Sequence, residues 1–113
     1  MEKNLRYGAL LSVYRALLTD KQAETMEYYY DEDLSLGEIA ENTGISRQGV
    51  RDFIKRAEEQ LDFFEEKIGL CAKMELIGDI EDLAKRIKTA RPGADVGRLA
   101  DKILESVRLF EEK

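Results

Sequence analysis

The chain has 113 residues, of which 43% are hydrophobic and 37% charged, with a single proline and a formal net charge of −6. This balance is typical of a helical domain, because a disordered chain is less apolar and a membrane protein is less charged. No apolar run approaches the roughly 20 residues of a membrane span, and residues 1–6 lack the apolar core of a signal peptide. The single cysteine, Cys71, allows no internal disulfide. We therefore expect a cytoplasmic protein.

The acidic balance also restricts the partners. A pI of about 4.8 gives the chain an overall field that repels phosphate backbones. Any contact with a nucleic acid therefore requires a local basic patch that works against this field.

Two helices are predicted in the N-terminal third. The first extends from about Glu2 to Leu18. Thr19 and Gln22 then have the spacing of a capping box, which predicts a second helix that continues to about Tyr30. The acidic run Asp31–Asp33 ends it. Apolar residues recur at steps of three and four, on the first helix at Leu5, Ala9, Leu10, Val13, Leu17 and Leu18 and on the second at Ala23, Met26, Tyr29 and Tyr30.

The segment from Ser35 to Leu61 has the pattern of a helix-turn-helix. Ser35 and Glu38 form a second capping box, which predicts a short helix that ends near Asn42. Ala40 provides a small residue where the second helix crosses the first, and Gly44 tolerates a positive φ in the turn. Ser46 then caps a longer helix, and apolar anchors flank the turn at Ile39, Ile45, Val50 and Phe53. The alternative is an ordinary helical hairpin.

Three apolar seams follow one another from Val50 to the C-terminus. The long helix is expected to bury Val50, Ile54, Ala57, Leu61, Phe64 and Ile68, with Gly69 as its end or kink. The next helix is expected to bury Leu76, Ile80, Leu83, Ile87 and Ala90 before residues 91–93 stop it. A last helix, residues 94–111, is expected to turn Val96, Ala100, Ile103, Val107 and Phe110 inward.

The predicted fold is therefore all-α. A helix-turn-helix domain occupies residues 1–68, and a C-terminal helical hairpin occupies residues 69–113. The hairpin either dimerises or folds back onto the first domain. Its long apolar seams favour a homodimer.

The run "EIAENTGISRQGVRDFIKRAEEQL" resembles region 4 of bacterial sigma factors. The longer segment from Leu17 to about Ile68 is similar to the YlxM-type family, through the blocks "LTDKQ" and "YYYDEDLSLGEIAE" and through the pattern "SRQ..V.D.IKR", in which dots mark positions that do not carry the similarity. This resemblance implies a sigma-like helix-turn-helix fold and a regulatory role in targeting by the signal recognition particle. Two positions depart from the family pattern: Gly49 stands where alanine is commoner, and Arg51 where an aromatic residue is commoner.

The first turns of the long helix carry the candidate nucleic-acid site, because that end of a recognition helix faces the groove. Arg47, Arg51 and Lys55 recur at steps of four. Arginine and glutamine side chains can pair with base edges, and lysine contacts phosphate. Asp52 and the acids from Glu58 onward oppose such a contact, so the alternative is a set of solvated charges. The predicted binding residues are Ser46, Arg47, Gln48, Arg51, Lys55 and Arg56.

Other clusters favour packing over chemistry. Of Tyr28–Tyr30, two are expected to pack between helices and one to lie at the rim, although a stacking platform for single-stranded RNA is the alternative. The carboxylate pairs Glu65–Glu66 and Asp79/Asp82 are interpreted as solvated faces, and Cys71 as a buried thiol. Without histidine or a glycine-rich phosphate loop, we expect a non-enzyme with no cofactor and no metal site.

Three functional hypotheses remain. The first is a DNA-binding transcriptional regulator. The second is an accessory factor that binds the RNA of the signal recognition particle or its GTPase. The third is a dimeric protein-binding scaffold whose helix-turn-helix is only structural. The leading prediction is a nucleic-acid-binding regulatory protein of the signal recognition particle pathway.

Overall fold

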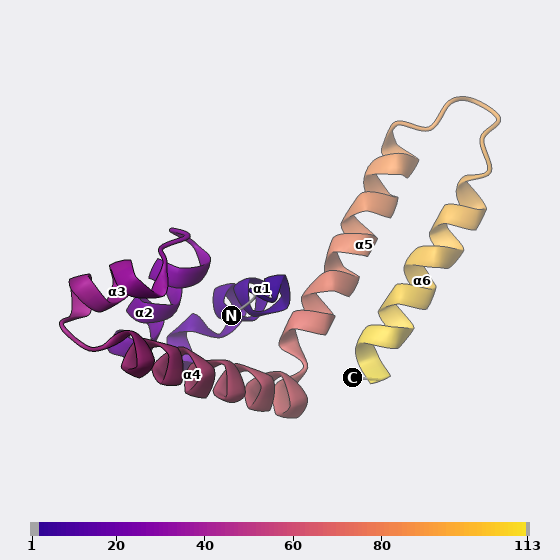
Figure 1. Ribbon diagram of the computed structural model, residues 1–113. Coiled ribbons are helices and arrows are strands. Elements are labelled where there is room, and N and C mark those ends of the chain that lie inside the picture. The colour runs from indigo at the N-terminus through magenta and orange to yellow at the C-terminus, as the bar shows by residue number, and fades with distance from the viewer. Residues whose placement is uncertain (1–2, 113) are drawn as a thin grey trace. The chain divides into compact units, whose positions relative to one another are not determined.

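The computed structural model describes residues 3–112, which form six α-helices and no strand. The helices are α1 (Leu5–Tyr14), α2 (Asp20–Tyr30), α3 (Leu36–Thr43), α4 (Arg47–Ile68), α5 (Leu70–Lys88) and α6 (Val96–Glu112) (Figure 1). The all-α prediction is confirmed. The described residues separate into two compact units between Ile68 and Gly69. The N-terminal unit holds α1–α4, and the C-terminal unit is the hairpin of α5 and α6.

The two predicted capping boxes are both present and start α2 and α3. The hydroxyl of Thr19 accepts the amide of Gln22 at 3.1 Å, and the Gln22 side chain accepts the amide of Thr19 at 3.0 Å. Ser35 and Glu38 make the same reciprocal pair, at 3.1 Å in both directions. Each box satisfies two amides that a helix start leaves without a partner in the helix. The sequence therefore defines both helix starts.

The first helix is shorter than predicted. It begins at Leu5, after the Asn4 side chain caps the amide of Arg6 at 3.0 Å. It ends at Tyr14, where a single 3₁₀ turn, Arg15–Leu17, leads to an extended Leu18. Glu2, the predicted start, lies outside the described residues.

The predicted inner face of α1 was also wrong in part. Leu10 and Leu18 are buried as expected, but Leu5 is 85% exposed and Leu17 is 54% exposed, and Ala9 is exposed as well. The buried positions include Leu11 and Tyr14 instead. Because α1 ends before Leu17, the 3₁₀ turn carries that side chain away from the face expected of a continuous helix.

The core of the N-terminal unit lies against one side of α4. Val50, Ile54, Ala57 and Leu61 are completely buried there, and α1, α2 and α3 all contact α4. Phe64 is partly buried and packs against the Tyr14 ring at 5.9 Å. The side chains of this core are Leu10, Leu11, Tyr14, Leu18, Ala23, Met26, Tyr29, Ile39, Val50, Ile54, Ala57 and Leu61. The predicted seam ends earlier than expected, because Ile68 is 47% exposed within the last turn of α4.

Gly69 ends α4 with φ +68°, and α5 follows. The predicted seam of α5 is confirmed: Leu83 is buried, and Leu76, Ile80, Ile87 and Ala90 are less exposed than their neighbours. Leu83 is the one buried side chain among the described residues of the hairpin. The C-terminal unit therefore has a thin core compared with the N-terminal unit.

The predicted seam of α6 requires a correction. Ile103 and Phe110 turn inward as expected, but Val96, Ala100 and Val107 are exposed. Leu99, Ser106 and Leu109 are partly buried instead. The helix also begins two residues later than predicted, after Asp95 caps the amide of Arg98 at 3.1 Å. The packing face of α6 therefore contains Leu99, Ile103, Ser106 and Phe110. A search for apolar residues alone does not find this face, because Ser106 belongs to it.

Candidate nucleic-acid interface

The turn between α3 and α4 is closed by two local hydrogen bonds. Gly44 has φ +75°, and its amide donates to the carbonyl of Ala40 at 2.9 Å, which closes α3. The hydroxyl of Ser46 accepts the amide of Gly49 at 3.0 Å, which caps the start of α4. A positive φ costs glycine little, whereas a residue with a Cβ is strained there. Ala40 is partly buried in α3, the first helix of the motif.

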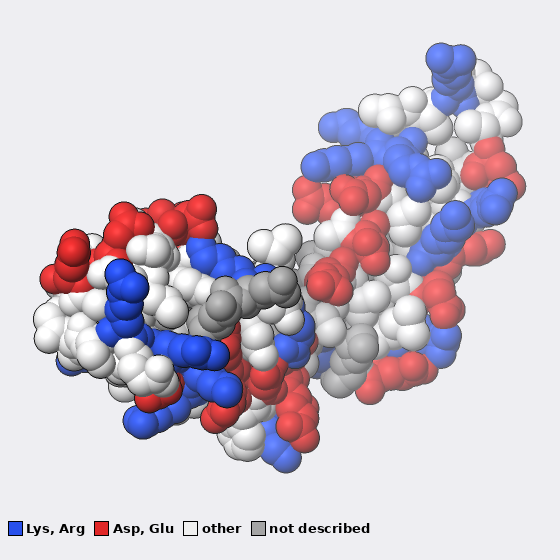
Figure 2. Space-filling view, in the orientation of Figure 1, with Lys and Arg blue, Asp and Glu red and all other residues white. Residues whose placement is uncertain are grey.

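The first turns of α4 present an exposed basic face. Arg51, Lys55 and Arg56 are all exposed, and none forms an ion pair or side-chain hydrogen bond with any of residues 3–112. Figure 2 shows Lys and Arg side chains gathered over this part of the N-terminal unit. We call Arg51, Lys55 and Arg56 the free basic face of α4. Its charges are available to an external anion without breaking an internal contact.

Among the remaining predicted contact residues, Gln48 and Ser46 have local hydrogen-bond partners, and Arg47 lies against a neighbouring helix. Arg47 is exposed, but its guanidinium lies over α3: a Cβ added to Gly37 would be 2.9 Å from its Nη2 atom. The Gln48 amide donates to Asp52 at 3.0 Å, and Ser46 caps the helix. A base edge would have to compete with these contacts, whereas a phosphate at the free basic face would not.

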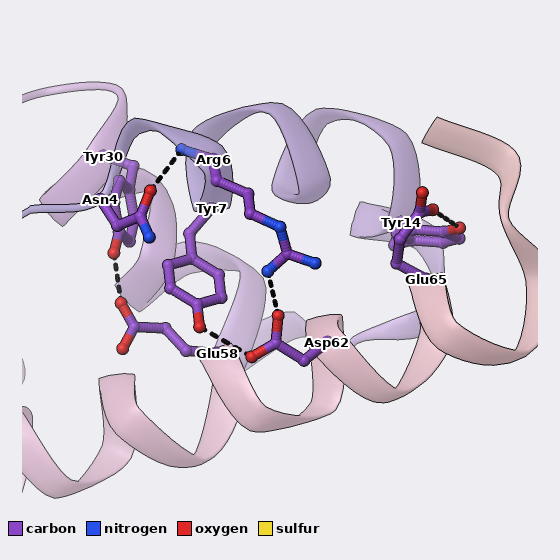
Figure 3. Close-up of polar contacts among 8 residues, drawn as sticks. All are labelled: Asn4, Arg6, Tyr7, Tyr14, Tyr30, Glu58, Asp62 and Glu65. Atoms are coloured by element: carbon purple, nitrogen blue, oxygen red, sulfur yellow. Dashed lines mark hydrogen bonds and ion pairs between the residues drawn. The ribbon is translucent and has the colours of Figure 1, made fainter. Parts of the chain in front are cut away.

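The second half of α4 is acidic, but three of its carboxylates are already engaged. Tyr7 of α1 donates to Asp62 at 2.7 Å, Tyr14 of α1 donates to Glu65, and Tyr30 of α2 donates to Glu58 (Figure 3). Arg6 also forms an ion pair with Asp62. Glu65 was predicted to belong to a solvated face, and this prediction was wrong. These acids tie α4 to α1 and α2.

The pKa shifts in this row follow from its contacts. The Tyr7 hydroxyl donates to the Asp62 carboxylate, and this bond, with burial and the negative charge, raises the pKa of Tyr7 to about 12. Burial alone would raise the pKa of Asp62, but the hydrogen bonds from Arg6 and Tyr7 outweigh it and lower that pKa. Burial, followed by the hydrogen bond to Glu58, raises the pKa of Tyr30. At neutral pH the tyrosines therefore stay protonated and Asp62 stays charged.

Sequence reasoning missed this tyrosine–carboxylate row. Its signal is nevertheless present, because Glu58, Asp62 and Glu65 repeat at steps of four and three directly behind the apolar stripe of α4. Tyr7 and Tyr14 are seven residues apart on α1, so they lie on one face of that helix. Polar residues that repeat at the edge of an apolar stripe indicate contacts between helices at the border of a core.

The tyrosine run packs largely as predicted. Tyr29 is buried, and its ring meets that of Tyr30 edge to face at 5.0 Å. Tyr30 is partly buried, and Tyr28 at the rim donates to Glu24 of its own helix. Asp79 and Asp82 are exposed as expected, but Cys71 is half-buried and not fully buried. None of the helices in residues 3–112 is both long and apolar enough to cross a membrane, and no acidic or thiol cluster in that range is arranged to hold a metal ion.

Comparison with known proteins places the helix-turn-helix in a wider group. Residues 1–96 match the family UPF0122, described as "Putative helix-turn-helix protein, YlxM / p13 like". A UPF0122 protein of Thermoanaerobacter sp. (strain X514) is 46% identical over 103 residues, which cover 91% of this chain and 83% of that protein. A relative in Caldanaerobacter subterraneus subsp. tengcongensis is 52% identical over 89 residues (77% and 76%), and one in Geobacillus kaustophilus is 46% identical over 95 residues (84% and 86%). The chain therefore belongs to the UPF0122 family of YlxM / p13-like helix-turn-helix proteins.

Proposed function

We propose that this protein is a cytoplasmic, non-enzymatic regulator that binds nucleic acid through the first turns of α4. The observation that carries the proposal is the free basic face: Arg51, Lys55 and Arg56 are exposed and unpaired within residues 3–112. They follow the turn in which Gly44 closes α3 and Ser46 caps α4. Cations in this position neutralise phosphates and release counterions, which provides the main part of non-specific affinity.

The resemblance to the YlxM-type family supports a place for the protein in the signal recognition particle pathway. Within that pathway the partner is the RNA of the particle, and its GTPase is the alternative protein ligand. Transcriptional regulation through duplex DNA is the competing function. Both nucleic acids offer a phosphodiester backbone, so the free basic face serves either, and base contacts by Arg47 and Gln48 would then select the sequence.

A salt titration tests this proposal. Binding of labelled duplex DNA and labelled particle RNA is measured over several salt concentrations for the wild type and for Arg51→Gln/Lys55→Gln/Arg56→Gln. Each lost phosphate contact should flatten the plot of log K against log [salt] by about 0.7–0.9. The triple variant should therefore lose roughly two units of slope or more.

A matched control removes three charges elsewhere. Lys21→Gln/Lys67→Gln/Arg108→Gln has the same net charge as the α4 variant, and all three positions are exposed. It should keep the wild-type slope to within about one unit. Equal slopes for the α4 variant and this control would refute the assignment of the site. The nucleic acid that gives the higher ratio of specific to random-sequence binding identifies the pathway.

A second copy of the chain is proposed as a further partner. The hairpin has exposed apolar side chains at its open end, at Leu70, Met74, Ile77, Leu104 and Val107. A hollow of about 320 Å³ between Ile77 and Val107 is lined almost wholly by apolar groups. Because the exposed apolar side chains recur at helical spacing on both helices, a two-fold dimer would bury them against the same apolar side chains of the second copy. This is the observation that favours a dimeric scaffold.

Light scattering behind a sizing column tests the pairing. The wild type should give about twice the chain mass of 13.0 kDa, and Ile77→Glu/Val107→Glu should give the monomer mass because unpaired charges in an apolar interface are costly. Ile80 and Ile103 are unsuitable positions, since they lie on the packing seam within the hairpin. A wild-type monomer at micromolar concentration would end the dimer proposal.

A further inference from the structure

The charges of the α5–α6 hairpin are separated along its length. Residues 85–102, which we call the loop end, contain six basic side chains and two acidic ones. The other residues from Gly69 on contain three basic and seven acidic side chains. Figure 2 shows the Lys and Arg side chains concentrated where α5 ends and α6 begins. In a chain of net charge −6, this is a second basic region, distinct in sequence from the first turns of α4.

Three of the loop-end cations surround one hollow. Arg86 of α5 and Arg98 and Lys102 of α6 line a depression of about 330 Å³, together with Leu99 and Asp95. All three cations are exposed, and none pairs with a carboxylate within the described part of the chain. Two other hairpin cations differ: Lys85 pairs with Glu81 at 2.9 Å, and Arg108 pairs with Glu105 and Glu112.

The acidic groups near this hollow leave it positive. Asp95 lies in its lining, but its carboxylate accepts the amide of Arg98 at 3.1 Å and is engaged as the cap of α6. The start of α6 adds the positive end of a helix dipole on the same side. A neighbouring hollow shares Arg86 and Lys102 and is lined by carboxylates as well, at Asp79, Asp82 and Glu105. These carboxylates limit the positive region on the side toward the open end.

We propose that the loop end, through Arg86, Arg98 and Lys102, is a second contact for the phosphodiester backbone of a nucleic acid. The inference rests on the proposed function and extends it to the C-terminal unit. The hollow is open and its cations are long side chains at the surface, so it suits point contacts with successive phosphates better than enclosure of a small anion. The exposed apolar groups named above lie toward the open end, so a second copy placed there would leave these cations uncovered.

Two such contacts on one chain would strengthen binding together. Once one basic region holds the nucleic acid, the other meets it at a high effective concentration, so the combined affinity exceeds that of either contact alone. An overall acidic protein would gain most from this arrangement, because each patch alone is weakened by the surrounding negative field. Loss of either patch should therefore weaken binding, and loss of both should abolish it.

The test compares three variants of the full chain with equal net charge. They are the loop-end variant Arg86→Gln/Arg98→Gln/Lys102→Gln, the α4 variant described above and the control Lys21→Gln/Lys67→Gln/Arg108→Gln. The probes are duplex DNA and duplex RNA of mixed sequence, about three helical turns long. The slope of log K against log [salt] is measured for each, and circular dichroism verifies that helix content is unchanged.

The loop-end variant should lose roughly two units of slope relative to the control on at least one probe. The probe that shows this loss identifies the source of the phosphates. If the loop-end variant matches the control while the α4 variant loses slope, the inference is overturned and the proposed function stands. An acidic protein segment as the true ligand of the loop end would give this same result. If only the loop-end variant loses slope, the α4 assignment fails and the inference stands. If the wild type binds neither probe, both are wrong.

Discussion

Replacement of Gly44 should destabilise the N-terminal unit through backbone strain alone. Gly44 has φ +75°, and a Cβ built at this position would meet no atom within 4 Å. No steric neighbour therefore contributes, and the cost is that of the left-handed conformation, about 1–2 kcal/mol for an ordinary L-residue. The amide bond to Ala40 at 2.9 Å holds the residue in this conformation. We expect the loss in free energy of unfolding to be smallest for Gly44→Asn, larger for Gly44→Ala and largest for Gly44→Val, at about 3 kcal/mol.

Urea unfolding followed by tyrosine fluorescence measures this loss selectively. All five tyrosines lie in residues 7–30, and the chain has no tryptophan, so the signal reports on the N-terminal unit. With a slope of about 1 kcal/mol/M for so small a unit, the midpoint of Gly44→Ala should fall by roughly 1–2 M. Gly8→Ala is the matched control, since Gly8 lies within α1 and its added Cβ also meets nothing within 4 Å. It should stabilise by about 0.5–1 kcal/mol. Overlaid melts for Gly44→Ala and the wild type, with Gly8→Ala shifted upward, would refute the reasoning.

Three further predictions concern the cap of α4 and the tyrosine–carboxylate row. Ser46→Ala should cost about 1 kcal/mol in the same urea assay, because the amide of Gly49 loses its acceptor. Gly49→Ala should gain less than Gly8→Ala, because its Cβ would lie 3.2 Å from the Ser46 hydroxyl; an equal gain would contradict this. Tyr7 should ionise near pH 12, where its ordinary value is 10.0, in a titration of phenolate absorbance. Since the pKa of Tyr7 is raised in the folded state, the contribution of Tyr7 to stability is complete below pH 10 and is lost toward pH 12. Asp62→Asn should lower the pKa of Tyr7 toward its ordinary value.

The parts of the fold that could be predicted from sequence are those with local causes. Both capping boxes and the glycine turn depend on residues within four positions of one another, so the sequence contains the whole interaction. The α5 seam was also correct, since its residues recur at steps of three and four, although Leu70, Met74 and Ile77 of the same helix are exposed. Local chemistry therefore determined where helices begin and end across the helix-turn-helix.

The inward faces of α1 and α6 could not be predicted in the same way. In α1 the leucines form nearly a full circle, and the packing partners select the face that includes Leu11 and Tyr14. In α6 the selected face includes Ser106 and leaves Val107 exposed. A count of apolar positions cannot decide such cases, because burial depends on helices that are distant in sequence.

The location of the candidate site could be predicted from the sequence, but not all of the contacts of its individual residues could. The spacing of Arg47, Arg51 and Lys55 identifies one basic stripe, and all three side chains are exposed. Their partners differ, however, because Arg47 lies over Gly37 of another helix. The contact of Gln48 with Asp52 spans four residues and was accessible to sequence reasoning. The contact of Tyr7 with Asp62 spans 55 residues and was not.

The negative charge of the chain is compatible with binding to nucleic acid because of where its acids lie. At physiological ionic strength the screening length is about 8 Å, so a phosphate at Lys55 is governed by its near neighbours and not by the sum over the chain. Farther along α4, Glu58 accepts a hydrogen bond from Tyr30, and Asp62 pairs with Arg6. The distant acids act mainly before contact, where they slow association and weaken binding to arbitrary sequences. An acidic chain with two local basic regions would therefore bind only a nucleic acid that places phosphates at those regions, and its net charge would favour selectivity over affinity.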